Sequence, residues 1–319
     1  YDGDAERELR ALFASDEPLQ QRLRALWSLH AIGAANDAFL REAMRSRDAL
    51  VRAWAVQLAS EDRATDAATR VQFTSMARDD DSPVVRLYLA AALQRLDVDD
   101  RWALAEALAD RAEDADDANV PLLVWYGVEP LVAADPLRAV RAFASCALPT
   151  VARFVVRRTA ADPAQHGALM QTLADATDSS ARVQRLEEAV IGLGAQRGLK
   201  APAGWTELAS ALSVDGEVRV QELARALAVA FGDAGTLPEL RRRLADREAA
   251  SAARHEALES SLRLKDPQLP TAVSALLDDA LLRPAAIRAL GQLDALDGAR
   301  RVLAVYASLT PEEKRDAVN

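Results

Sequence analysis

Two segments of the chain, "DALVRAWAVQLASED" (residues 48–62) and "DSPVVRLYLAAALQRLD" (residues 81–97), share one pattern. Each begins with an acidic residue, continues with a Val-Arg pair and runs on as a mostly apolar stretch. The two arginines of these pairs, Arg52 and Arg86, lie 34 residues apart. A repeat of this length is typical of helical hairpins, which cannot bury their apolar faces alone and bury them by stacking on one another.

The sequence around these segments has the spacing of amphipathic helices. In "LQQRLRALWSLHAIG" (residues 19–33), Leu23, Leu26, Trp27 and His30 belong to a set of residues spaced by three and four, which lies on one face of a helix. Similar spacing recurs along nearly the whole chain, and no stretch alternates convincingly with period two. Ala and Leu dominate the composition and only 5% of the residues are aromatic, so we expect an all-α fold.

The length of the chain sets its domain organisation. At 319 residues it exceeds what one ordinary core supports. The strongest cluster of helix breakers is "GLKAPAG" at residues 198–204. We therefore predict a continuous array in two blocks, an N-terminal block over residues 1–198 and a C-terminal block over residues 199–319.

Residues 48–97 resemble HEAT repeats, in which the second helix of each hairpin commonly opens with an acidic residue and carries Val-Arg followed by Ala and Leu. The likeness is weaker in "RHEAL" (254–258) and "RPAAI" (283–287), which share Arg-x-x-Ala-aliphatic. In "LPTVARFVVRRTA" (148–160), Ala152 stands where the arginine is expected. The resemblance implies a right-handed α-solenoid of HEAT-like hairpins, related to armadillo-like arrays, whose usual work is to hold partners.

A narrower resemblance concerns the order of several segments. The chain is similar to the helical region of large planctomycete-type proteins that join a β-propeller "membrane-bound dehydrogenase" part, HEAT repeats and a C-terminal c-type haem domain. The segments that carry this likeness are "LRALWSLHAIG" (23–33), "VRAWAVQLASED" (51–62), "SPVVRLYLAAALQRL" (82–96), "NVPLLVWYGVEPL" (119–131) and "PEEKRDAVN" (311–319). The haem attachment motif Cys-x-x-Cys-His is absent. The resemblance thus implies no cofactor in this chain, a haem c in a neighbouring domain, and an extracytoplasmic (periplasmic) parent protein.

Composition limits the classes of partner. Acidic residues outnumber basic ones 49 to 39, which gives a formal net charge of −10 and disfavours nucleic acid as a partner. No apolar run is long enough to cross a membrane, so no membrane insertion is expected. The chain begins at Tyr1 without an initiator methionine, and we interpret it as a piece of a longer protein.

The stretch "DANVPLLVWYGVEP" (residues 117–130) is the most irregular in composition. Asp117 and Asn119 can accept hydrogen bonds from the free backbone N–H groups at a helix start. Gly127 and Pro130 predict that this helix bends or stops over residues 127–130. The stretch is therefore expected to be a joint between two helices.

Glu129, at the end of this stretch, is expected to lie in a largely apolar wall, where an unpaired carboxylate would cost several kcal/mol. It therefore needs a partner. One interpretation pairs it with an arginine of the same chain and makes the stretch a structural joint; the alternative makes it part of a groove for another domain or a ligand. The residues that the two interpretations involve, besides Glu129, are Trp125, Tyr126, Arg153, Arg157 and Arg158.

Arg52 and Arg86 are predicted to bond to acids or carbonyl groups of neighbouring hairpins, as a ladder that fixes the stacking of the repeats. The alternative is an anion-binding ridge. The acidic stretch at residues 110–118 does not fit a calcium-binding loop and is expected to be an exposed loop. Cys146 lies on an apolar stripe, which indicates a buried thiol with a packing role.

These observations predict no catalytic, cofactor-binding or metal-binding residues, and we expect a chain that is not an enzyme. The predicted function is a scaffold or protein-interaction segment of a larger extracytoplasmic c-type haem redox protein, with a protein or neighbouring domains as partners. Two alternatives stay open. One is a cytosolic protein-interaction adaptor unrelated to haem, and the other is a helical-repeat enzyme, like a DNA glycosylase or a lyase, with a concave active groove.

Overall fold

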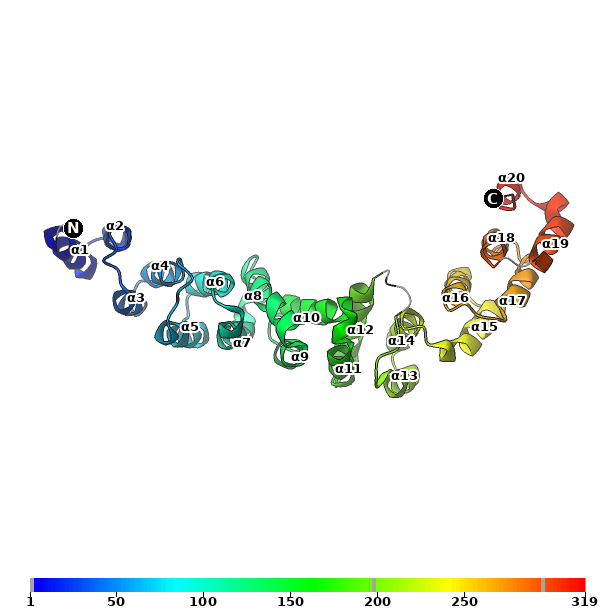
Figure 1. Ribbon diagram of the computed structural model, residues 1–319, viewed down its shortest axis with the longest axis horizontal. Coiled ribbons are helices and arrows are strands. Elements are labelled where there is room, and N and C mark those ends of the chain that lie inside the picture. The colour runs from blue at the N-terminus through cyan, green and yellow to red at the C-terminus, as the bar shows by residue number, and fades with distance from the viewer. Residues whose placement is uncertain (1–2, 195, 197–198, 294–295, 319) are drawn as a thin grey trace. The chain divides into compact units, whose positions relative to one another are not determined.

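The computed structural model describes residues 3–194, 196, 199–293 and 296–318, and the regular elements in these ranges are all helices. They follow one another along the chain as hairpins (Figure 1). The α-helices are α1 (Gly3–Ala14), α2 (Leu19–Ala31), α3 (Asp37–Ala43), α4 (Ala49–Ala59), α5 (Ala67–Asp79), α6 (Pro83–Ala92), α7 (Trp102–Ala109), α8 (Val120–Ala134), α9 (Pro136–Phe143), α10 (Pro149–Ala161), α11 (His166–Ala174), α12 (Ser179–Leu193), α13 (Trp205–Ser213), α14 (Val218–Ala230), α15 (Leu237–Ala245), α16 (Ser251–Arg263), α17 (Leu269–Leu276), α18 (Arg283–Gln292), α19 (Leu296–Val305) and α20 (Pro311–Asp316). The prediction of an all-α solenoid of HEAT-like hairpins is confirmed.

Short polar and proline-containing connections set the helix starts. Asn36 accepts a hydrogen bond from the backbone N–H of Phe39 at the start of α3. Asp135 caps α9 in the same way. Pro83 and Pro149 occupy the first turn of α6 and α10, where a missing N–H costs nothing. The connections thus define where each helix of a hairpin begins.

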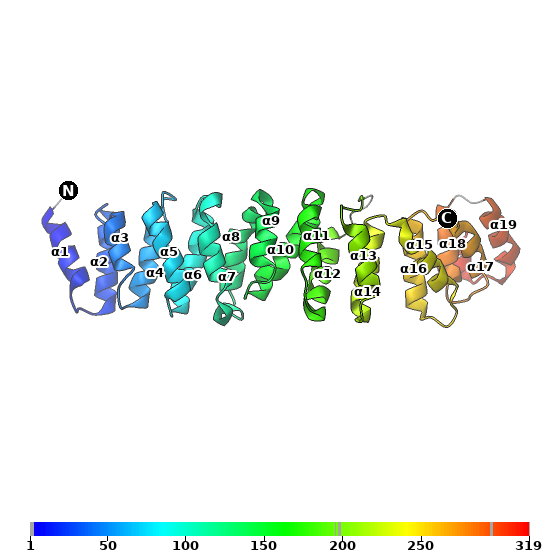
Figure 2. The same ribbon diagram turned by 90° about the horizontal axis from the view of Figure 1, so that it is seen from below.

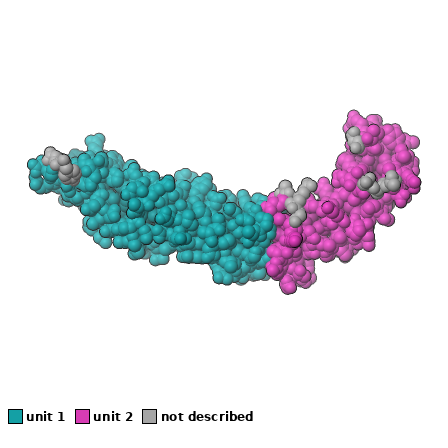
Figure 3. Space-filling view, viewed as in Figure 1, with its two compact units in different colours: residues 1–192 teal, residues 193–319 magenta. Residues whose placement is uncertain are grey.

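The chain divides into two compact units, residues 1–192 and 193–319 (Figure 3). In the first unit, the second helices of successive hairpins form one layer and the first helices form the other (Figures 1 and 2). The core between the layers contains fully buried residues from successive second helices, among them Leu26, Val56, Leu89, Val124 and Val155. Each hairpin therefore buries its apolar faces against its neighbours.

The second unit has a core of its own. Its buried residues come from α14 to α20 and include Leu240, Leu258 and Leu282. At its beginning, the ring of Trp205 packs edge-on against Phe231, with 5.0 Å between the ring centroids. The block boundary predicted after residue 198 falls at residues outside the described ranges, and that division stays a prediction.

Helix α8 contains most of the stretch predicted as a joint. It continues through Gly127 and Pro130 to Ala134, so the helix does not stop at residues 127–130, and the alternative, a bend there, stays a prediction. Gly127 has another role, because a Cβ atom there would lie 2.7 Å from the Cβ of Leu93. The glycine is therefore a close-packing position between α8 and the end of the preceding hairpin.

Candidate functional site

A ladder of arginines and aspartates links successive hairpins of the first unit. Arg52 lies in the first turn of α4 and donates from Nε and Nη2 to the two carboxylate oxygens of Asp80, at 2.7 and 2.8 Å. Arg86 holds the same position in α6 and donates to both oxygens of Asp114, at 2.5 and 2.7 Å. Each arginine also donates to a backbone carbonyl in the loop of its own hairpin. Each rung thus connects the loops of two adjacent hairpins.

Charge and burial reinforce the two rungs. The hydrogen bond to Asp114 raises the pKa of Arg86 above its ordinary value. Burial raises the pKa of Asp80, but hydrogen bonds from Arg52 and from a backbone N–H outweigh burial and lower it overall. The side chains of Arg86 and Asp114 are only 4% and 3% exposed. Most of residues 110–118 are exposed, as expected, but Asp114 within this stretch is buried.

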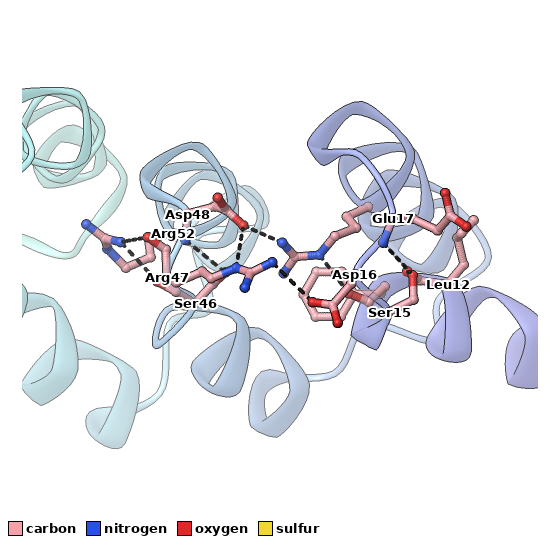
Figure 4. A network of polar contacts seen from close by, with 10 residues as sticks. Leu12, Ser15, Asp16, Glu17, Ser46, Arg47, Asp48 and Arg52 are labelled. Atoms are coloured by element: carbon pink, nitrogen blue, oxygen red, sulfur yellow. Dashed lines mark hydrogen bonds and ion pairs between the residues drawn. The ribbon is translucent and has the colours of Figure 1, made fainter.

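The ladder begins at the first hairpin. Arg22 of α2 forms an ion pair with Asp48 and donates to the carbonyl of Phe13 at 3.1 Å. Arg47 lies beside this rung, 3.8 Å from a carboxylate oxygen of Asp48 and 3.3 Å from one of Asp16 (Figure 4). Successive loops are therefore joined by charge-assisted contacts from α2 onward.

The ladder is interrupted at α8 and α10. Arg52 and Arg86 are the fourth residues of their helices. The fourth residues of α8 and α10 are Leu123 and Ala152. In α10, Arg153 and Arg157 take a different partner, and their Nε atoms donate at 2.6 and 2.7 Å to the two oxygens of Glu188, which is buried. Glu188 could not be recognised in the sequence, because an acid within a helix gives no local sign that it is buried.

Glu129 lies at the surface. Its side chain is 49% exposed and its carboxylate oxygen is 3.9 Å from Nε of Arg158, at the outer limit of an ion pair. The expected apolar wall around this carboxylate is therefore wrong, since α8 presents Glu129 to solvent. At the start of the same helix, Asp117 accepts from the backbone N–H groups of Asn119 and Val120, both at 2.8 Å, and these bonds lower its pKa. The Asn119 side chain makes no capping bond.

Aromatic side chains recur at one register of the second helices. The sixth residue of the helix is aromatic in four of them: Trp54 in α4, Tyr88 in α6, Trp125 in α8 and Phe154 in α10. The rings of Trp54 and Tyr88 have centroids 6.0 Å apart, and those of Trp125 and Phe154 have centroids 5.4 Å apart. The repeat thus places an aromatic ring beside the next one along the layer.

Some of the aromatic rings on the second helices face solvent. Trp27 of α2 packs edge-on against Trp54, with centroids 4.9 Å apart, and stays 39% exposed. Trp54, Tyr88 and Tyr126 line a cavity of about 420 Å³ across α4, α6 and α8, and Tyr126 is 50% exposed. We call Trp27, Trp54, Tyr88, Leu122 and Tyr126 the aromatic face. Exposed apolar surface of this kind is typical of interaction sites.

The adjacent residues Trp125 and Tyr126, predicted to act together, have separate environments. Trp125 is buried at 9% exposure, whereas Tyr126 belongs to the aromatic face. Trp27 was expected on the apolar stripe of its helix, and Trp54 and Tyr88 were not identified. Their shared register was the signal in the sequence that could have identified them.

The described residues offer few groups for chemistry. Among them, no cluster of three or more His, Cys, Asp or Glu side chains could hold a metal ion. Burial raises the pKa of the Cys146 thiol to about 11. None of the helices within the described ranges has the length and apolar character needed to cross a membrane.

Comparison with known proteins gives a distant structural similarity. No protein-family model and no curated protein matches the chain. Among solved structures, it is similar to human deoxyhypusine hydroxylase in complex with glycerol, with 17% identity, 91% of this chain and 97% of that chain covered, and a TM-score of 0.26.

This similarity corrects one prediction. The matched protein is an enzyme by its name, so the expectation that this chain is not an enzyme, which rested on the lack of predicted catalytic residues, is withdrawn. At that TM-score, the match transfers no activity to this chain. The resemblance to the helical region of c-type haem proteins stays a prediction.

Proposed function

We propose that the first unit holds a partner protein, and that the aromatic face is where an apolar segment of that partner binds. The observation that supports this proposal is the row of contacting rings, Trp27, Trp54 and Tyr88, that opens onto a cavity also lined by Tyr126. Trp and Tyr are the residue types that most often dominate binding energy at protein interfaces. They present a large apolar surface at a small cost in conformational entropy.

The ladder supports the same proposal, because its arginines lie on the helices that carry the rings. Rungs such as Arg86–Asp114 fix the position of each hairpin against the next. The rings carried by α2, α4 and α6 are therefore held at defined spacings before any partner binds. A preorganised surface loses less entropy on binding than one that must be ordered by its ligand.

The test is a selection of peptide ligands on the whole chain, followed by measurement of Kd for each selected peptide. We expect peptides rich in apolar and aromatic residues that compete with one another. Trp54→Ala and Tyr126→Ser should each weaken binding by about 2 kcal/mol, roughly 30-fold in Kd. The matched control is Val71→Ala, because Val71 is 71% exposed on α5, in the other layer.

Two outcomes would contradict the proposal. Selected peptides that bind Trp54→Ala and Tyr126→Ser as well as they bind the unaltered chain would place the contact elsewhere. Peptides whose affinity drops equally with Val71→Ala would indicate a nonspecific apolar interaction. Circular dichroism of each variant separates loss of the site from loss of the fold, and Tyr126→Ser is the safer variant because its ring is half exposed.

The resemblance to multidomain haem proteins suggests one source of the partner segment. We propose that it belongs to a neighbouring domain of a longer extracytoplasmic c-type haem redox protein. In that case, the isolated flanking domain should bind in trans and lose affinity with Tyr126→Ser. Binding of selected peptides without binding of the flanking domain would reject this source of the partner segment. It would not affect the proposal that the aromatic face is a binding site.

A further inference from the structure

The second unit contains a cavity of about 350 Å³. It lies among α13, α14 and α15, which follow one another in Figure 2, and the short 3-10 turn before α15. Besides alanines and a glycine, its lining holds the polar residues Ser213, Gln221, Arg225, Asp233, Thr236, Glu239 and Arg242. The Asp233 carboxylate accepts from the indole N–H of Trp205 at 3.0 Å and from the backbone N–H of Gly235 at 2.9 Å. A volume of this size is within the range of cavities that hold small molecules or single side chains of a ligand.

Arg225 is distinguished from the other polar residues of this lining. Gln221 donates to the carbonyl of Asp215 at 2.7 Å, the hydroxyl of Thr236 donates to a carbonyl at 2.9 Å, and Arg242 forms an ion pair on its own helix. Arg225 is partly buried on α14, and within the described ranges it has neither a hydrogen bond nor an ion pair. Its guanidinium group therefore brings unused donors to the wall of the cavity.

A second arginine, Arg243, adds positive charge near Arg225, although it does not line the cavity. Burial, and next the charge of Arg243 on α15, lower the pKa of Arg225. Arg243 is also partly buried and has no hydrogen bond or ion pair among the described residues. Two like charges in a partly desolvated place repel one another, and this repulsion is relieved when an anion binds between or beside them.

The nearby acids do not neutralise Arg225. In the described part of the chain, Glu239, which lines the same cavity, and Glu222 and Glu256 favour its charged form without a hydrogen bond or ion pair to it. Glu222 forms an ion pair with Arg219 at 3.3 Å, and Glu239 forms one with an arginine of its own helix. These two carboxylates thus have other cations as closer partners. The guanidinium of Arg225 is left available for an oxygen acceptor that enters the cavity.

We propose that this cavity binds the oxyanionic group of a small ligand, a carboxylate or a phosphate, with Arg225 as the principal contact and Arg243 as the second positive charge. The planar fork of a guanidinium matches two oxygens of either group. The hydroxyl groups of Ser213 and Thr236, which line the same cavity, donate to backbone carbonyls, so their oxygens can accept hydrogen bonds from donor groups on the rest of such a ligand. The site lies in the second unit and does not depend on the aromatic face.

The test uses the whole chain and two probes, inorganic phosphate and succinate. Each is titrated to about 20 mM at constant ionic strength, while the side-chain Nε–Hε signal of Arg225 is followed by NMR and heat by calorimetry. We expect saturable binding of at least one probe, with a shift of that signal. Arg225→Gln should weaken binding about 10-fold or more, since one charge-assisted hydrogen-bonding group is lost.

The matched control is Arg263→Gln, which removes an exposed arginine of the same unit that has no ion pair among the described residues. It should bind both probes as the unaltered chain does. Arg225→Lys keeps the charge without the fork and should have intermediate affinity, which covers the case in which Arg225→Gln does not fold. Absence of saturation for both probes, or equal binding by the unaltered chain and folded Arg225→Gln, would overturn the proposal. Preference for one probe identifies the ligand as a carboxylate or a phosphate.

Discussion

Replacement of Arg86 by methionine should strongly destabilise the first unit. The Arg86 and Asp114 side chains are almost fully buried, and Arg86 makes three hydrogen bonds, two to the Asp114 carboxylate and one to the Asp80 carbonyl. Arg86→Met leaves the carboxylate of Asp114 buried without its cation. Loss of one partner of a buried ion pair lowers the free energy of unfolding by about 3–5 kcal/mol. This figure exceeds half the total stability of many domains.

The assay is urea denaturation followed by circular dichroism, with hydrogen exchange of the α6 and α8 amides as a local readout. Arg45→Met is the matched control, because Arg45 and its partner Glu42 are 66% and 72% exposed and their pair should contribute no more than about 0.5 kcal/mol. The double variant Arg86→Met with Asp114→Leu removes both charges and should regain most of the lost stability.

Two results would refute this reasoning. A loss below about 1 kcal/mol for Arg86→Met would mean that the Asp114 carboxylate finds water or another partner. A double variant as unstable as the sum of the two single variants would mean that packing, and not the unpaired charge, causes the loss.

Three further predictions concern single positions. Arg52 holds the pKa of the Asp80 carboxyl below its ordinary value, so this carboxyl binds a proton less tightly in the folded chain than in the unfolded chain. The stability that the ionised Asp80 contributes should therefore persist above about pH 5 and fall below about pH 4, where acid protonates the carboxylate. Asp80→Asn should reduce this loss of stability in acid, as measured by circular dichroism. Gly192→Ala places a Cβ 2.3 Å from a backbone carbonyl oxygen of α10 and should destabilise by about 3 kcal/mol in urea, whereas Gly167→Ala meets open space and should be neutral or stabilising by up to about 1 kcal/mol; equal effects would contradict the packing argument. With its pKa at about 11, Cys146 should react with iodoacetamide at pH 8 more than about 100-fold slower than glutathione, as measured by mass spectrometry, and unfolding in urea should abolish the difference.

The sequence located the arginines of the ladder but only part of their surroundings. Arg52 and Arg86 could be recognised because each occupies a fixed place in a local pattern. Their partners Asp80 and Asp114 lie in the loops of the next hairpin, and only stacking brings them together. Residues 110–118 look like a solvated loop because the burial of Asp114 comes from the neighbouring repeat and not from its own segment.

The aromatic face could be predicted less well. Helical periodicity indicates which side of a helix faces its neighbours, but it does not tell how far the neighbours cover each side chain. Trp125 and Tyr126 are adjacent in sequence, yet one is buried and the other half exposed. The expected stop of α8 was wrong as well, since Pro130 disfavours a helix locally but lies inside one.

The rungs of the ladder also make its repeats interchangeable. Arg52 and Arg86 hold equivalent positions, and each reaches an aspartate in the following loop. A chain lacking residues 53–86 would join Arg52 directly to the rest of α6 and would present it to Asp114 in the place that Arg86 now occupies. At this place the array can therefore lose or duplicate one hairpin and keep an arginine opposite each aspartate, so that its length can change without a redesign of the stacking there.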